Sequence, residues 1–89
     1  MAEKYCDEVP AFKCTGHGKG RSKAVAAEKA KEDAQVNADA ACADHSGCDS
    51  PRICMGELIK LVSIDDEEAP KGEYGIVEVW EAKCVCKTL

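Results

Sequence analysis

The chain has 89 residues, a net charge of −5, 45% hydrophobic residues and seven cysteines. This length allows one domain with a thin core, and no apolar run is long enough to cross a bilayer. The net negative charge argues against general nucleic-acid binding, so nucleic acid is not an expected partner. Without a long apolar run, a membrane is not an expected partner either.

The first elements in chain order are a flexible segment at residues 1–8 and a short strand at residues 9–15 within a single domain that spans residues 9–89. The sequence GHGKG follows and predicts a loop, because glycine permits backbone conformations that other residues avoid. Ser22 is a suitable N-cap, and from Lys23 to about Asp44 the chain contains strong helix formers without Pro or Gly.

An alanine stripe marks one face of this predicted helix. Its members are spaced three or four residues apart, namely Ala27, Ala30, Ala34, Ala38 and Ala41. Alanine lets a helix backbone approach its neighbour closely. We therefore expect this face to pack on a sheet.

Two further strands follow the helix. Residues 53–64 are rich in Ile, Leu and Val, residues 65–75 contain turn-forming Pro and Gly, and residues 76–86 alternate in character. The predicted fold is a single small α+β domain of β-α-β-β order, with a three-stranded mixed sheet and one long Ala-rich helix on one face. The last strand is placed in the middle of the sheet. The other sheet face needs a cover, which a homo-oligomer through this open face would supply.

Seven cysteines approach the density of a disulfide scaffold, and their odd number leaves one thiol over. Cys84 and Cys86 lie two residues apart on one strand face, where a bond between them would be strained, so each is expected to have its own partner. The disulfide candidates are Cys14, Cys42, Cys48, Cys54, Cys84 and Cys86. Cys6 is the candidate free thiol because it lies near the N-terminus.

A metal site is the alternative use of these residues. The sequence CADHSGC places Cys42, His45 and Cys48 in a C-x2-H-x2-C array, and Cys54 would be a fourth ligand. Thiol and imidazole ligands suit zinc or copper. The closely spaced C-x2-C pair that is common in zinc sites is missing.

The basic glycine-rich segment is a candidate anion site. Residues 9–27 carry a charge of +4 and the remainder of the chain −9. A helix N-terminus beside exposed glycines and cations suits phosphate, sulfate or a carboxylate. The candidate residues are Gly16, Gly18, Lys19, Gly20, Arg21, Ser22 and Lys23. The segment matches neither a P-loop nor a dinucleotide fingerprint, because Arg21 stands where each requires glycine.

Two family resemblances are partial. The sequence GKGRSKAVAAEKA is similar to the turn and second helix of double-stranded-RNA-binding domains, but the strands that follow contradict that family. The β-α-β-β order resembles that of dodecins, which are small flavin-binding oligomers, although Trp80 lies in the third strand instead of near the helix end. Neither resemblance assigns the chain to a family.

The function predicted from sequence is therefore that of a small cysteine-rich, disulfide-stabilised domain that binds or assembles without catalysis. The alternatives are a Cys/His metal-binding protein and a carrier of a small anion. An enzyme is not favoured, since no catalytic constellation is apparent and a thioredoxin-type C-x-x-C motif is missing. The cysteine content favours a secreted or periplasmic protein with its leader removed, and a cytoplasmic location is almost equally compatible.

Overall fold

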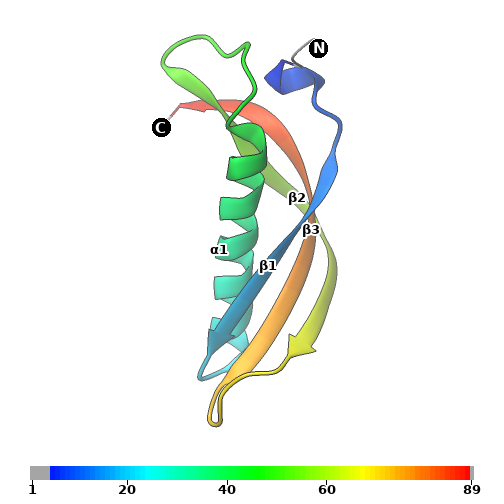
Figure 1. Ribbon diagram of the computed structural model, residues 1–89, viewed down its shortest axis with the longest axis vertical. Coiled ribbons are helices and arrows are strands. Elements are labelled where there is room, and N and C mark those ends of the chain that lie inside the picture. The colour runs from blue at the N-terminus through cyan, green and yellow to red at the C-terminus, as the bar shows by residue number, and fades with distance from the viewer. Residues whose placement is uncertain (1–4, 89) are drawn as a thin grey trace.

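The computed structural model describes residues 5–88. In chain order they form a short 3-10 helix η1 (Cys6–Glu8), strand β1 (Phe12–Gly20), helix α1 (Lys23–Cys42) and the long strands β2 (Arg52–Glu67) and β3 (Tyr74–Thr88). The molecule is elongated, and α1 runs along a strongly twisted sheet (Figure 1). The 3-10 helix, the loop between α1 and β2 and the end of β3 lie together at one end of the molecule.

The sheet has the order β1-β3-β2, and both neighbouring pairs are antiparallel. The α+β class, the β-α-β-β order and the single helix on one face are confirmed. The expected mixed sheet is not found. β1 and β2 run in the same direction, but β3 lies between them and separates them, so the two strands do not pair with each other.

β2 and β3 are longer than the sequence predicts. They include residues 65–67 and 74–75, so the hairpin loop shrinks to residues 68–73. Asp65 and Asp66, which fall in the predicted turn segment, belong to β2. They can lie in the strand because their side chains are exposed.

The glycines at positions 16, 18 and 20 belong to β1 and not to a loop, so the predicted loop is wrong. They alternate along the strand, which places all three on the face that meets α1. A methyl group added at Gly16 would overlap the carbonyl oxygen of Ala30 and the amide nitrogen of Ala34. The strand backbone therefore contacts the helix backbone directly.

The buried stripe on α1 differs slightly from the predicted one. Its members are spaced four residues apart, namely Ala26, Ala30, Ala34, Ala38 and Cys42. Ala27 is half-buried and Ala41 is exposed. A spacing of four turns the stripe by about 40° around the helix at each step. The stripe therefore follows the twist of the sheet.

Polar side chains of α1 bind the backbone of both outer strands. Asn37 donates from Nδ2 to the carbonyl of Thr15 at 2.7 Å, and Asp33 accepts from the amide of His17 at 2.9 Å. On the other outer strand, Gln35 donates to the carbonyl of Gly56 at 2.8 Å. The amide of Gly56 donates to Asp39 at 2.9 Å. Because backbone groups on outer strands otherwise need water, these bonds attach both sheet edges to the helix.

The N-cap prediction is confirmed, because the Ser22 hydroxyl accepts from the amide of Val25 at 3.2 Å. The alternation predicted for residues 76–86 places one face of β3 against α1. Ile76, Ala82 and Cys84 on it are buried, and so is Glu78, whose Oε1 accepts from Trp80 Nε1 at 2.7 Å. This bond explains how a carboxylate is tolerated on a face that packs against the helix.

The opposite sheet face is open and carries charged side chains. Lys13 of β1 and Lys60 of β2 are both paired with Glu81 of β3, which lies between them. His17 Nδ1 lies 3.0 Å from a carboxylate oxygen of Glu67. This face is therefore compatible with solvent. Within residues 5–88 no helix has the length and apolar character needed to cross a membrane.

Candidate functional site

Three disulfides join the helix, the strands and the flanking loops. Cys42 at the end of α1 is bonded to Cys84 of β3. Cys48 in the loop is bonded to Cys86 of β3. The third bridge links Cys6 of η1 to Cys54 of β2. Cys84 and Cys86 therefore have separate partners.

The predicted roles of Cys6 and Cys14 are reversed in the structure. Cys6 is 1% exposed and is bonded, whereas Cys14 is the free cysteine. The prediction used distance from the chain end and missed the contact between η1 and the loop after α1. There, the amide of Cys6 donates to the carbonyl of Ser46 at 2.8 Å. Residues 5–8, which were expected to be flexible, are thus held by a hydrogen bond and a bridge.

The six bonded sulfurs form one group, which we call the sulfur cluster. The Sγ atoms of Cys6, Cys48 and Cys86 lie within 4.8 Å of one another, and so do those of Cys42, Cys54 and Cys84. Since Cys6 is bonded to Cys54, this central bridge has one outer bridge on each side. The sequence carried no sign of this arrangement, because it depends on where the twisted strands bring the sulfurs.

Burial is graded across the sulfur cluster. Cys42 and Cys84 are 0% and 5% exposed, and the central Cys6 and Cys54 are 1% and 7% exposed. The outer bridge of Cys48 and Cys86 is only half-buried. A reagent in solution therefore reaches the Cys48–Cys86 bridge more easily than the other two.

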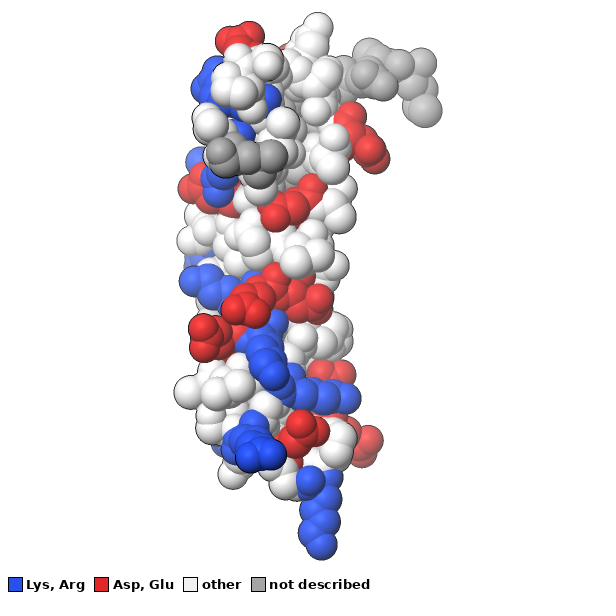
Figure 2. Space-filling view, turned by 90° about the vertical axis from the view of Figure 1, so that its left-hand side faces the viewer, with Lys and Arg blue, Asp and Glu red and all other residues white. Residues whose placement is uncertain are grey.

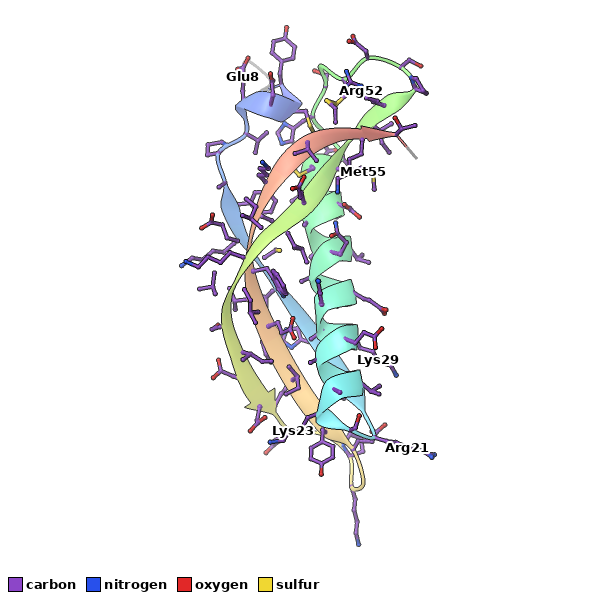
Figure 3. The ribbon with its side chains drawn as sticks, turned by 180° about the vertical axis from the view of Figure 1, so that it is seen from behind. Glu8, Arg21, Lys23, Lys29, Arg52 and Met55 are labelled. Atoms are coloured by element: carbon purple, nitrogen blue, oxygen red, sulfur yellow. A yellow bond between two sulfur atoms is a disulfide. The ribbon has the colours of Figure 1, made fainter. Side chains whose placement is uncertain are left out.

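A pocket of about 370 Å³ lies against this cluster, and we call it the cysteine-end pocket. Its lining includes His45, Cys48, Arg52 and Cys54. The Arg52 guanidinium lies 3.6 Å from a carboxylate oxygen of Asp49, and both side chains are solvent-accessible. Figure 3 shows Arg52 at the end of the molecule that carries the sulfur atoms, with Arg21 and Lys23 at the opposite end.

The free thiol of Cys14 lies apart from this cluster, packed near Ala34, Ala38 and Ala82. Burial raises the pKa of the Cys14 thiol by removing the thiolate from water. Since the thiolate is the form that attacks disulfides, the protonated thiol in this environment is unreactive toward the bridges.

The predicted metal ligands are not a free set in this structure. Cys42, Cys48 and Cys54 are each bonded to a different partner, which leaves His45 as the one residue of the predicted four that is not in a disulfide. Zinc and copper bind thiolates, which a disulfide does not provide. Coordination by these sulfurs would therefore require the reduced chain.

The glycines of the predicted anion site are not accessible to a ligand. Gly16 and Gly18 are covered by α1, so their amides cannot approach a ligand closely. Arg21, Ser22 and Lys23 remain exposed at the turn into α1. Seen from the helix side, Lys and Arg alternate with Asp and Glu instead of forming one basic patch (Figure 2). The anion site remains a prediction from sequence.

An apolar strip occupies the middle of β2. We define the β2 strip as Ile59, Leu61, Val62 and Ile64, whose exposures are 46%, 39%, 43% and 49%. It follows the part of β2 that α1 binds at Gly56. Two register shifts against β3, between Leu58 and Lys60 and between Leu61 and Ser63, lie within it.

Comparisons with family models, curated proteins and solved structures find no match. The class of protein is therefore defined by the fold and the bridges: a small cysteine-rich α+β domain stabilised by three disulfides.

Proposed function

We propose that this domain acts without catalysis, by assembly, and that its partner is a second copy of the same chain bound at the β2 strip. The observation that carries this proposal is the exposure of four large apolar side chains within six residues of an outer strand. Outer strands with exposed apolar side chains are frequent sites of association.

The chemistry of the β2 strip favours a second copy over an unrelated partner. Lys60 lies near its start and Asp65 directly after its end. Two β2 strands that meet antiparallel about a two-fold axis between Val62 and Ser63 bring Lys60 of each chain opposite Asp65 of the other. Lys60 and Asp65 are therefore complementary in charge across this axis, as an isologous interface requires.

The register shifts make this arrangement consistent for Leu61 and Ile64 as well. Because of the shifts, Lys60 and Asp65 point to the open face of the sheet, whereas Leu61 and Ile64 point to the helix side. The same two-fold axis then brings Leu61 of one chain opposite Ile64 of the other. A strand with register shifts, such as β2, pairs poorly with most other strand edges. Pairing of two β2 strands would therefore depend on the match of these side chains, which would select this register.

The alternative surface is the open sheet face, on which the sequence-based prediction of a homo-oligomer relied. One of its cross-strand rows combines Lys13, Glu81 and Lys60, which would have to lose water on association. The β2 strip carries no such cost at Leu61, Val62 and Ile64. We therefore place the proposed interface on β2.

The test is the concentration dependence of molar mass, measured by light scattering and sedimentation equilibrium. We expect dimers in the wild type and monomers in Ile64→Lys. The matched control is Val36→Lys, which changes an apolar side chain of α1 that is 63% exposed, and it should leave the dimer intact. A wild type that stays monomeric at millimolar concentration would refute the proposal.

A charge exchange tests the two-fold geometry. Lys60→Glu places like charges opposite Asp65 and should weaken the dimer, and adding Asp65→Lys should restore it. Lys13→Glu is the control, because Lys13 faces the same Glu81 from the other side of β3. Equal weakening by Lys60→Glu and Lys13→Glu would show that the effect is intrachain and not at the interface.

Metal binding is proposed only as a second candidate, for the reduced chain. Two sets of three sulfurs, each within 4.8 Å, would supply the thiolates that zinc or copper prefers. Elemental analysis of the reduced chain refolded with zinc tests it, with Cys14→Ser as the control because Cys14 is outside both sets. A metal content no higher than that of an unfolded, reduced sample would exclude this candidate.

A further inference from the structure

We propose that the cysteine-end pocket is a thiol–disulfide exchange site, at which a small carboxylate-bearing thiol reacts with Cys48. The exchange is then relayed through the sulfur cluster to the buried Cys42–Cys84 bridge. The proposal is independent of self-association at β2. It rests on the pocket, the graded burial and the distances between the sulfurs.

The point of entry follows from burial and from the pocket lining. Cys48 lines the pocket and belongs to the half-buried bridge. Arg52 lines the same pocket, and its fixed positive charge favours a thiol that carries a carboxylate. A small thiol fits the available volume of about 370 Å³.

The first step is attack by the external thiolate on Cys48 Sγ. A mixed disulfide forms between the small thiol and Cys48, the Cys48–Cys86 bond breaks, and Cys86 leaves as a thiolate. Exchange of this kind needs no oxidant or reductant, since one S–S bond forms for each that breaks.

The next two steps pass the exchange inward. Cys86 Sγ lies within 4.8 Å of Cys6 Sγ, so its attack on Cys6 forms Cys6–Cys86 and releases Cys54 as a thiolate. Cys54 Sγ lies within 4.8 Å of both Cys42 and Cys84. Its attack on Cys84 forms Cys54–Cys84 and releases Cys42, which takes up the proton lost by the external thiol.

The products balance the reactants. Three S–S bonds joining protein sulfurs and one free external thiol become two such bonds, one mixed disulfide at Cys48 and one free thiol at Cys42. The chemical consequence is that a reaction at the surface opens the bridge between α1 and β3. Each protein molecule reacts once, so this is a modification and not turnover.

The experiment treats the oxidised full-length protein with reduced glutathione as the probe, quenches with acid, alkylates free thiols and maps the products by tandem mass spectrometry. We expect glutathione on Cys48, a new Cys6–Cys86 bond and the alkyl label on Cys42. Cys14 is already free and is labelled in every sample, so a new label confined to Cys86, with Cys6–Cys54 intact, would overturn the relay. No adduct on any of the six bonded cysteines would overturn the site.

Two variants separate the relay from the pocket. Cys6→Ser combined with Cys54→Ser removes the central bridge, so the label should stop at Cys86, whereas Cys14→Ser should change nothing. Arg52→Glu should slow adduct formation several-fold with glutathione but not with neutral 2-mercaptoethanol. Equal rates of the wild type and Arg52→Glu with glutathione would overturn the assignment of the pocket. Circular dichroism of the oxidised variants confirms that each is folded. The disulfides and labels mapped in the wild type test the relay even if a variant does not fold.

Discussion

Removal of single bridges measures what the sulfur cluster contributes to stability. The three disulfides join residues 48, 42 and 38 positions apart in the sequence. In the chain-entropy model, loops of these lengths each contribute about 4 kcal/mol at 25 °C, and the three values differ by only ~0.2 kcal/mol. A small domain has a free energy of unfolding of about 5–15 kcal/mol, so one bridge is a large share of it.

The chain-entropy contributions of the three bridges are nearly equal. A difference between bridges in their effect on the free energy of unfolding must therefore come from packing. Cys48→Ala with Cys86→Ala should lower the free energy of unfolding by about 4 kcal/mol. Cys42→Ala with Cys84→Ala removes two fully packed sulfurs and should cost about 2 kcal/mol more. Both side chains of the latter pair are at most 5% exposed.

The assay is equilibrium unfolding in guanidinium chloride, followed by circular dichroism in acidic buffer, where the Cys14 thiol stays protonated. The m-value should rise in both variants, since an unfolded chain without the bridge exposes more surface. If removal of Cys48–Cys86 costs under about 1 kcal/mol, the entropic argument is wrong for this chain. If the two variants lose equal stability, buried sulfur packing contributes nothing measurable.

Three further predictions concern the helix and its contact with β1. Gly16→Ala should destabilise the fold by about 3 kcal/mol, because the added methyl group meets backbone atoms of Ala30 and Ala34 that cannot rotate away. Gly72→Ala is the control and should cost about 1 kcal/mol, because this hairpin glycine has a φ of 87° but nothing lies within 4 Å of the new methyl group. The assay is chemical denaturation, and equal losses of stability in the two variants would contradict the close contact of β1 with α1. Ser22→Ala should cost about 1 kcal/mol in the same assay, because it removes the hydroxyl that accepts from Val25, and an unchanged midpoint would show that the cap is unimportant. The raised pKa of Cys14 means that the folded state holds the thiol proton more tightly than the unfolded state, in which the pKa of this thiol is near 9.0. The stability that this proton contributes is therefore complete below pH 9.0 and is lost as the pH rises through the folded-state pKa. Thermal unfolding between neutral and strongly alkaline pH should therefore show a smaller loss in Cys14→Ser than in the wild type, and parallel curves would refute this.

Local sequence patterns were sufficient for the helix, for the two strands of the hairpin and for the order of the elements. The helix formers after Ser22 gave α1, and the apolar runs around Leu58 and Val79 gave two strands of a hairpin. These signals depend on neighbours within a few residues, which one sequence displays directly.

The errors arose where one residue type has two uses. Glycines at alternate positions resemble a flexible loop, yet the same residues allow a strand backbone to lie against a helix backbone. A flexible loop and a strand packed on a helix can be distinguished by combining two spacings. Small residues recur every two residues in β1, at Gly16 and Gly18, and every four residues in α1, at Ala26, Ala30 and Ala34. Neither spacing is decisive alone, because only their combination specifies contact.

Disulfide pairing could not be predicted for a related reason. The partner of Cys6 depends on η1 lying beside the loop after α1, and a backbone hydrogen bond to Ser46 sets that contact. The odd thiol lies at Cys14 because the strand places it under α1, away from the other sulfurs. Both facts follow from tertiary structure and have no counterpart in local pattern.

The two ends of the molecule are consequently stabilised by different interactions. Bulky side chains are scarce, with 4% aromatic residues, and the core compensates in two ways. At one end six sulfurs link the helix, the strands and the loops. Toward the other end, Ala26 and Ala30 hold α1 against Gly18 with no covalent link.

This division has a consequence for the two proposed sites. Exchange at Cys48 would loosen the end of α1 at Cys42, whereas the contact of α1 with Gly16 and Gly18 does not involve sulfur. The β2 strip lies beyond Gly56, past the bridged end of that strand. Treatment with glutathione should therefore open the bridge from α1 to β3 while the dimer mass persists. Loss of the dimer in parallel with labelling of Cys42 would show that the two ends of the molecule are coupled.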